Sequence, residues 1–443
     1  MATVAFATLG CRVNQVDTQE IQGRLESRGF RTVPFGSPAD VVIINTCTVT
    51  ARADFSDRQS IRRAVRAHPR ARVVVTGCWA QTNPGAVAGI PGVDLVVGIA
   101  DRHRIDALVS DLATAQRPAV PTARIVAGDV SEGVPLWPAP LARPTGRSRA
   151  FLKIQDGCQH RCAFCIVPYA RGASRSREPK VIADQVRELV DAGHREVVLT
   201  GIDMGHYGAD LIPRTTLAAL LRTLGEVPGL CWLRLSSVLP AYFTPELIEA
   251  VTTVPVVAPH LHIPLQSGSD RVLRRMRRPY NVRLYRALVE KLAQGISGLG
   301  LGTDLIAGFP GETDDDFRLT EDLVTTLPFS YLHVFAYSDR KGTEAVRLLG
   351  HVPTQVIAER SRRLRDLARA KRRSFHGRML GGRHEVLVLG TRDRASGWLT
   401  GLTGNYVEVL FEGPDSLMGR LVGVRITEVE SDRVLGELEA NAA

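Results

Sequence analysis

The chain has 443 residues, of which 44% are hydrophobic and 23% are charged. This composition is that of an ordinary globular protein, and it excludes wholesale disorder and fibrous repeats. At about 150 residues per domain, the length predicts roughly three domains. Lysine and arginine number 56 against 46 acidic residues, giving a net charge of +10.

The cysteine content needs an explanation that fits the expected compartment. The sequence has no run of about 18 apolar residues, so we expect no transmembrane helix and no membrane partner. The N-terminus, MATVAFATLGCRVNQ, lacks a basic stretch before its short apolar run, so a secretory signal is not expected. These features predict a cytoplasmic protein. Because disulfides are rare in the cytoplasm, the seven cysteines point to another role.

Residues 1–114 alternate between strand and helix patterns. Apolar runs at 4–8, 41–45, 72–76 and 94–98 predict strands, with helical stretches at about 16–28 and up to 67. Such alternation predicts an α/β domain with a parallel sheet. Residues 115–148 are rich in Pro, Ala and Arg without a clear period, and we expect a linker.

The α/β alternation resumes at 149 and defines a second domain over residues 149–375. Strands are predicted at 151–154, 196–199, 232–236, 260–263, 300–306 and 331–336. Six βα units in about 200 residues predict a complete or partial (βα) barrel. Residues 376–443 instead carry short strands with Gly-containing turns, which predict a small all-β module resembling a five-stranded oligonucleotide-binding barrel.

Two segments concentrate the positive charge. Residues 359–383 hold ten basic and two acidic residues, and residues 270–288 hold seven arginines and one aspartate. Either run alone is more typical of a solvated helix face. Together, in a basic chain, they favour a polyanionic partner.

Three cysteines share one loop directly after the first predicted barrel strand. Cys158, Cys162 and Cys165 form C-x3-C-x2-C. Three thiolates at this spacing suit three irons of a cubane cluster, with the fourth iron open to a cofactor. A structural zinc site that recruits His160 is the alternative, but the triplet lacks the paired C-x2-C ends of zinc ribbons. The end of a barrel strand also favours catalysis.

Three further cysteines follow separate strands. Cys11, Cys47 and Cys78 end the stretches ATLGC, IINTC and VVTGC. In a parallel sheet these ends share one edge, where open α/β sheets bind ligands. Each cysteine alone is more typical of a small buried residue. Their repeated position predicts a second three-cysteine cluster, whereas Cys231 in LCWLRL is expected in the core.

The loop CQHRCAFC resembles the signature of the radical S-adenosylmethionine (SAM) enzymes, and the chain as a whole resembles their methylthiotransferase family. Stretches that carry the wider resemblance are SRSRE (174–178), LTGID (199–203), HIPLQSGSDRVLRRMRR (262–278), DLIAGFPGET (304–313) and VFAYSDRKGTEA (334–345). The resemblance implies two [4Fe-4S] clusters, one on Cys158, Cys162 and Cys165 and an auxiliary one on Cys11, Cys47 and Cys78. It also implies SAM as cofactor, an RNA-binding TRAM barrel at the C-terminus, an electron donor such as flavodoxin or ferredoxin, and a sulfur source.

The resemblance further implies which residues contact SAM. Phe164, before the third cysteine, matches the aromatic position beside the adenine. Thr200 and Gly201 follow the second barrel strand, where the methionyl amine commonly binds, although an ordinary βα turn explains them equally well. Gln266 and Asp304 are further candidates, whereas Leu239 stands where relatives often carry a polar residue and cannot hydrogen-bond. We expect His262 and His333 to lie inside the barrel.

The stretch TLGCRVNQVDT resembles the branch that modifies N6-threonylcarbamoyladenosine (t6A) at position 37 of tRNA, inserting sulfur and methyl at C2. The isopentenyladenosine branch more often reads YGCQMN, and the ribosomal-protein branch LGCPKN. An anticodon loop, whose bases can be splayed out, suits a basic surface. The alternatives are those two branches, and an iron–sulfur protein that binds RNA without catalysis.

Overall fold

The N-terminal sheet is parallel throughout. In the computed structural model, which describes residues 1–49, 51–117, 122–131, 136, 148–430 and 433–439, its strand order is β2-β1-β3-β4-β5-β6. Its strands are β1 (Thr3–Thr8), β2 (Arg31–Val33), β3 (Val41–Thr46), β4 (Arg72–Gly77), β5 (Leu95–Val97) and β6 (Arg124–Val126). Every residue of β3 and β4 is buried, as expected for Val- and Ile-rich strands covered on both faces.

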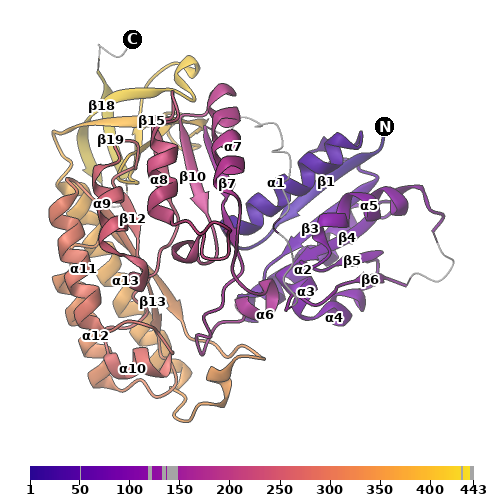
Figure 1. Ribbon diagram of the computed structural model, residues 1–443, viewed down its shortest axis with the longest axis horizontal. Coiled ribbons are helices and arrows are strands. Elements are labelled where there is room, and N and C mark those ends of the chain that lie inside the picture. The colour runs from indigo at the N-terminus through magenta and orange to yellow at the C-terminus, as the bar shows by residue number, and fades with distance from the viewer. Residues whose placement is uncertain (50, 118–121, 132–135, 137–147, 431–432, 440–443) are drawn as a thin grey trace. The chain divides into compact units, whose positions relative to one another are not determined.

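Helices cover both faces of this sheet (Figure 1). Apolar residues of α1 (Arg12–Ser27) and α5 (Ile105–Thr114) pack on one face. The other face packs against α2 (Ala51–Ala67), α3 (Cys78–Thr82) and α4 (Pro84–Ala88). The predicted parallel α/β domain is therefore confirmed.

One strand lies where a linker was expected. Strand β6, within residues 115–148, pairs in parallel with β5 and extends the N-terminal sheet. Its residues are exposed or half-buried, so it lacks the apolar run by which a buried strand is found in a sequence. The parts of 115–148 at 118–121, 132–135 and 137–147 lie outside the described residues.

The second α/β region contains six strands in two parallel sheets of three. One has the order β11-β10-β7 and the other β12-β13-β14. They are β7 (Arg149–Lys153), β10 (Glu196–Thr200), β11 (Trp232–Leu235), β12 (His260–His262), β13 (Gly300–Ala307) and β14 (Tyr331–Ala336). All six predicted strands are confirmed, and the region forms a partial barrel of two half-sheets.

Helices follow these strands in turn, which is the pattern of βα units. They are α7 (Pro179–Asp191), α8 (Leu217–Gly225), α9 (Pro245–Thr253), α10 (Asp270–Arg275), α11 (Val282–Gly295), α12 (Asp314–Thr326) and α13 (Thr354–Gly377). Among the described residues, no helix has both the length and the apolar character needed to cross a membrane.

The C-terminal module is a closed β-barrel, as predicted. Its strand order is β15-β16-β17-β19-β18. The strands are β15 (Arg383–Arg392), β16 (Leu399–Thr403), β17 (Glu408–Phe411), β18 (Leu421–Glu430) and β19 (Arg433–Leu438). Phe375, from the end of α13, and Met379 just beyond it contribute to the barrel core.

A buried arginine ties this barrel to the preceding sheet. Arg234 on β11 is fully buried and pairs with Glu196 at 2.8 Å. It also donates hydrogen bonds to the carbonyl oxygens of Gly404, at 2.8 Å, and Thr403, at 3.3 Å. Because these carbonyls belong to the β16 end and turn of the barrel, the contact fixes the barrel to the βα region.

The described residues group into two compact units. We call the first the cysteine unit; it comprises the described residues within 1–143, 155–177 and 338–346. The second, the barrel unit, comprises those within 144–154, 178–337 and 347–443. All six candidate cluster cysteines belong to the cysteine unit.

Candidate active site

The strand-end cysteines follow three adjacent strands of the N-terminal sheet. Cys47 comes directly after β3, Cys78 directly after β4, and Cys11 shortly after β1. The sheet order β1-β3-β4 makes these strands neighbours. Their carboxyl ends therefore deliver three thiols to one edge, as the sequence predicts.

Two glycines allow the backbone to come close to this edge. Gly10 has φ +93°, and a Cβ there would lie 2.7 Å from the Cys47 Sγ. Gly77 has φ +101°, and a Cβ there would lie 2.3 Å from the carbonyl oxygen of Thr46. Any side chain at either position would fill the space that brings the cysteine loops together.

Two asparagines brace the same loops. The Asn14 side-chain amide donates to the carbonyl oxygens of Leu9 and Thr46, both at 2.8 Å. The Asn45 amide donates to the carbonyl oxygen of Asn14, also at 2.8 Å. These bonds tie the end of β1 to the end of β3, next to Cys11 and Cys47.

The electrostatics of the thiols fit a metal cluster. Burial raises the pKa of Cys47 to about 11, with a further contribution from Cys11. Burial also raises the pKa of Cys78 to about 12; Cys11 and Cys47 raise it further, while Arg171 lowers it. The three thiols are thus electrostatic neighbours, and the Cys47 and Cys78 thiols stay protonated at neutral pH without a cation. Metal coordination deprotonates thiols, and thiolates are the ligands of iron–sulfur clusters. The three strand-end cysteines are therefore suitable ligands for an iron–sulfur cluster.

The other three cysteines lie on the loop between β8 (Gln155–Asp156) and α6 (Val167–Arg171). The Cys165 N–H donates to the Cys162 carbonyl, and the Cys158 N–H donates to the Gly172 carbonyl, both at 3.0 Å. Strand β8 also pairs with β9 (Arg175–Ser176), which closes the base of the loop. Cys162 is buried, while Cys158 and Cys165 are half-buried. The loop therefore has a fixed backbone with three thiols at its turn, which fits a cluster with an open iron.

Arg171 connects the two cysteine sets. It ends α6, directly after the three-cysteine loop, and its side chain is 1% exposed. Its guanidinium donates to Asp156 at 2.8 Å, to Asp17 at 2.8 Å and to Asn14 at 2.6 Å. A hydrogen bond and the charge of Arg171 act on Cys78. Residues of the loop's own helix thus reach the strand-end thiols.

Arg171 belongs to a larger buried network with four arginines and three carboxylates. Its members are Arg102, Arg171, Arg175, Arg177, Asp17, Glu20 and Asp156. The Arg171 guanidinium lies beside Cys78, a thiol that must ionise to bind metal, so its charge favours the thiolate form. Packing strengthens this link, because Ala170 of α6 contacts Cys78 and Ile99 in one apolar cluster.

Sequence reasoning missed this network. The sequence signal for it is an acidic residue shortly before the first cysteine and a basic residue shortly after the third. These are Asp156, in DGC, and Arg171, in ARG. Asp17, a partner of Arg171, lies six residues after Cys11 on α1, and no linear motif connects the two segments.

The predicted SAM-contact residues divide between the two units. Phe164 lies half-buried on the three-cysteine loop of the cysteine unit. Thr200 ends β10 in the barrel unit, and Gly201 follows it. The Thr200 hydroxyl donates to the Leu152 carbonyl at 3.2 Å, so it helps to join β10 to β7.

Gln266 and Asp304 lie together in the barrel unit. The Gln266 N–H donates to the Asp304 carbonyl at 2.8 Å. Gln266 has φ +71°, a conformation that non-glycine residues rarely adopt and that is frequent at functional sites. Although burial raises the pKa of Asp304, the adjacent His262 and His333 lower it below its ordinary value. The Asp304 carboxylate is therefore ionised.

Three minor expectations have mixed outcomes. His262 is buried as expected, but the prediction for His333 is wrong, because its side chain is 55% exposed. His333 shares a face of the sheet with His262, but it lies on the edge strand β14, which is buried mainly at its start. Cys231 is half-buried rather than in the core, with its thiol 3.7 Å from the Gly229 carbonyl oxygen.

Comparison with known families matches two parts of the chain. Residues 3–98 match the family described as uncharacterized protein family UPF0004, and residues 152–324 match the radical SAM superfamily. The second match includes the three-cysteine loop, so it favours a [4Fe-4S] cluster with SAM over structural zinc.

Comparison with curated proteins gives relatives over nearly the whole chain. The chain is 40% identical to threonylcarbamoyladenosine tRNA methylthiotransferase MtaB of Bacillus subtilis, covering 96% of this chain and 94% of that protein. It is 37% identical to the MtaB of Aquifex aeolicus, covering 96% and 100%. It is also 37% identical to tRNA-2-methylthio-N(6)-dimethylallyladenosine synthase of Moorella thermoacetica, covering 98% of each.

Among solved structures, the fold is similar to that of the radical SAM methyltransferase TsrM from Kitasatospora setae. The TM-score is 0.56 at 16% identity, with 76% of this chain and 73% of that chain covered. At this identity the likeness concerns the fold alone.

Proposed function

Because this chain belongs to the methylthiotransferase family of radical SAM enzymes, we propose that it transfers a methylthio group to C2 of t6A at position 37 of tRNA. The observation that carries the proposal is the joining of both cysteine sets in one compact unit through Arg171. The Bacillus and Aquifex relatives are threonylcarbamoyladenosine tRNA methylthiotransferases, which supports the t6A branch.

In this proposal Cys158, Cys162 and Cys165 hold the cluster that binds SAM, and Cys11, Cys47 and Cys78 hold an auxiliary cluster. When bound, these groups supply the one-electron cleavage of SAM and the sulfur that is transferred. The chain's own residues fix the three strand-end thiols at the sheet edge, bury Cys47 and Cys78, and favour the ionised form of Cys78 through Arg171. Phe164, Thr200, Gly201, Gln266 and Asp304 are proposed to contact SAM or the target base.

The domains then have separate tasks. Residues 1–114 form the methylthiotransferase domain, residues 149–375 the radical SAM domain, and residues 376–443 a TRAM-like barrel. The barrel and the basic α13 hold the tRNA anticodon arm. An electron donor such as flavodoxin or ferredoxin and an external sulfur source complete the set of partners.

The first test is mass spectrometry of tRNA nucleosides from cells with and without this gene. We expect the 2-methylthio form of t6A to disappear while unmodified t6A accumulates. Loss of the methylthio group from the isopentenyl nucleoside instead would keep the family and overturn the branch. If no tRNA nucleoside changed, the tRNA assignment would fail, and a ribosomal protein would become the substrate to examine.

The second test separates the two cysteine sets. Cys162→Ala should abolish SAM cleavage while leaving tRNA binding intact. Cys47→Ala should retain SAM cleavage but block methylthiolation. Cys231→Ala removes a half-buried thiol outside both sets and should leave both activities unchanged. Continued methylthiolation by the Cys47 variant would contradict the auxiliary-cluster role.

A further inference from the structure

Two histidines and an aspartate converge on one face of the barrel unit. His262 lies on β12, Asp304 on β13 and His333 on β14, three adjacent strands of one sheet. In the register, His262 pairs with Gly302 and Asp304 pairs with His333. Because Gly302 and Asp304 are two residues apart on β13, all three side chains share a face.

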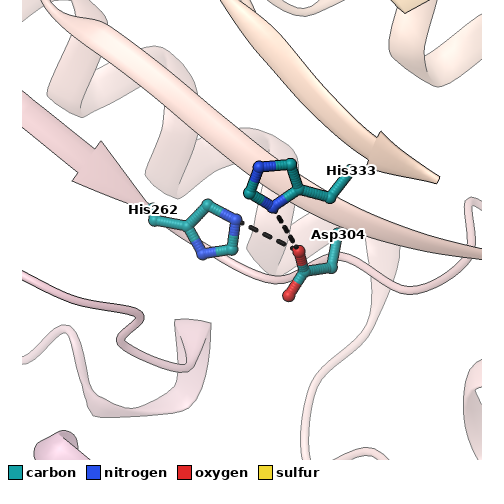
Figure 2. Close-up of side chains that lie close together, drawn as sticks. All are labelled: His262, Asp304 and His333. Atoms are coloured by element: carbon teal, nitrogen blue, oxygen red, sulfur yellow. Dashed lines mark hydrogen bonds and ion pairs between the residues drawn. The ribbon is translucent and has the colours of Figure 1, made fainter. Parts of the chain in front are cut away.

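The donor atoms meet closely. Figure 2 shows both imidazole rings directed at one carboxylate oxygen of Asp304. The His262 Nε2 and the His333 Nδ1 each lie 3.2 Å from the Asp304 Oδ1. One ligand atom from each residue lies within 4.8 Å of the other two.

Hydrogen bonding alone does not account for this arrangement. Within the described part of the chain, the buried His262 Nε2 has no partner in hydrogen-bond geometry, although His262 is only 7% exposed. The Asp304 Oδ1 already has a hydrogen-bond partner in the His333 Nδ1 at 3.2 Å. The His262 Nε2 is therefore the atom left without one, and a buried nitrogen of this kind would be satisfied by a bound third group.

The separations suit a metal ion. Zinc binds imidazole nitrogen and carboxylate oxygen at about 2.0–2.2 Å, which places neighbouring ligands of a tetrahedron roughly 3.3 Å apart. The two measured nitrogen–oxygen distances are close to that edge length. Three protein ligands would leave a fourth position, and the half-exposed His333 gives that position access to solvent.

Neighbouring side chains hold the ligands in place. The Ser237 Oγ lies 2.7 Å from the His262 Nδ1, which orients the ring so that Nε2 is directed at the site. The Tyr331 ring packs against both imidazoles, with centroid distances of 6.0 Å to His262 and 5.2 Å to His333. Such outer contacts are typical of metal-ligating histidines.

We propose that His262, Asp304 and His333 bind a divalent transition-metal ion, with Zn²⁺ as the best-fitting species. Its three ligands are nitrogen and oxygen donors of the barrel unit, whereas the six cysteines belong to the cysteine unit. It leaves at least one coordination position for water or a ligand. The Asp304 carboxylate would then be a metal ligand in place of its proposed contact with SAM or the target base.

The test is a Zn²⁺ titration of the full chain with both cysteine sets already loaded with iron and sulfide, followed by calorimetry. Wild-type protein should bind one Zn²⁺ per chain. Asp304→Asn and His333→Ala should each weaken binding at least about tenfold. His351→Ala removes an exposed histidine outside the site and should bind as wild type does.

X-ray absorption at the zinc edge identifies the ligands in the same samples. Nitrogen and oxygen neighbours without sulfur would support the proposal, whereas sulfur neighbours would assign the zinc to cysteines and overturn it. Unchanged binding in both triad variants, or no binding by wild type, would also overturn it. Iron content and circular dichroism confirm that each variant is folded. No tRNA product is measured, so the result is independent of the proposed reaction.

Discussion

Arg171 has its guanidinium between two buried carboxylates and beside a thiol, so single-residue effects should be largest there. Removing one partner from a buried ion pair leaves the other charge uncompensated, which costs about 3–5 kcal/mol. Lysine keeps the charge but lacks the planar fork needed to reach several acceptors at once. The stability of these buried ion pairs therefore depends on the shape of the Arg171 guanidinium as well as on its charge.

We predict that Arg171→Gln lowers the free energy of unfolding of the cluster-free protein by about 3–5 kcal/mol. It should also reduce the iron bound after reconstitution, and Arg171→Lys should fall between Gln and wild type. Urea unfolding and iron analysis measure both effects. Lys180→Gln, which removes an 86% exposed cation, should change neither. Equal urea midpoints for Arg171→Gln and wild type would refute the structural role.

Gly77 tests the close approach at the strand-end cysteines. Gly77 and Gly29 both have positive φ, but a Cβ at Gly29 would meet nothing within 4 Å. Alanine at Gly29 therefore adds only backbone strain, of roughly 1–2 kcal/mol. Alanine at Gly77 adds a clash with the Thr46 backbone, so we expect it to lose iron from the strand-end set. If iron per chain after reconstitution were equal in both variants, the close approach would not be needed.

At the scale of elements, the N-termini of α10 and α12 share one carboxylate. Thr313 and Asp316 form a capping box at the start of α12. Asp316 also accepts a hydrogen bond at 2.6 Å from Ser269, the N-cap of α10. Although burial raises the pKa of Asp316, hydrogen bonds from Arg271, Ser269 and Thr313 lower it below its ordinary value. One ionised side chain thus stabilises two helix ends.

This arrangement predicts a pH-dependent effect of Asp316→Asn. A carboxyl whose pKa is lowered by folding stabilises the protein above its unfolded pKa of about 3.9, and loses that effect as pH falls through the folded value. The variant should be about 1 kcal/mol less stable at pH 7, with the difference shrinking below about pH 4. Asp315→Asn, at an 84% exposed position of the same turn, is the control. Thermal unfolding across this pH range measures both; a pH-independent difference would contradict the mechanism.

Elements with strong apolar patterns could be predicted from the sequence, and those without could not. Strands β3 and β13 are buried along most of their length, so their apolar runs mark them. Strand β6 has three exposed or half-buried residues and no such signal. The cysteine edge could be predicted because strand ends are visible in the sequence. The bridging role of Arg171 could not be predicted, because its partners on α1 lie more than 150 residues away in the sequence.

At the scale of the molecule, the excess positive charge is less available than the composition suggests. On α13, Arg360 is buried against Glu312, and Arg363 pairs with Glu321. Arg362 and Arg369 both pair with Asp366. Several arginines of the basic run are therefore neutralised by acidic side chains of the same chain. This is what we expect of an ordinary solvated helix face, the alternative to a polyanion-binding surface for this run.

Other cations of α13 are not matched in this way. Arg365 and Arg373 are exposed, and neither forms an ion pair with any residue that the structure describes. If α13 holds the tRNA backbone, these two arginines should contribute more than the pair neutralised by Asp366. Each phosphate contact contributes about 0.7–0.9 to the slope of log affinity against log salt concentration.

We therefore predict that Arg365→Gln/Arg373→Gln weakens tRNA binding and reduces this slope by about 1.5. The matched control, Arg362→Gln/Arg369→Gln, removes the same formal charge but leaves Asp366 unpaired. If Arg362 and Arg369 do not contact phosphate, the control should leave the salt slope unchanged. It should still weaken tRNA binding, because the unpaired Asp366 carboxylate repels the phosphates. Fluorescence anisotropy at several potassium chloride concentrations measures both slopes. Equal slopes for the Arg365/Arg373 variant and wild type would move the tRNA contact away from α13 and onto the terminal barrel.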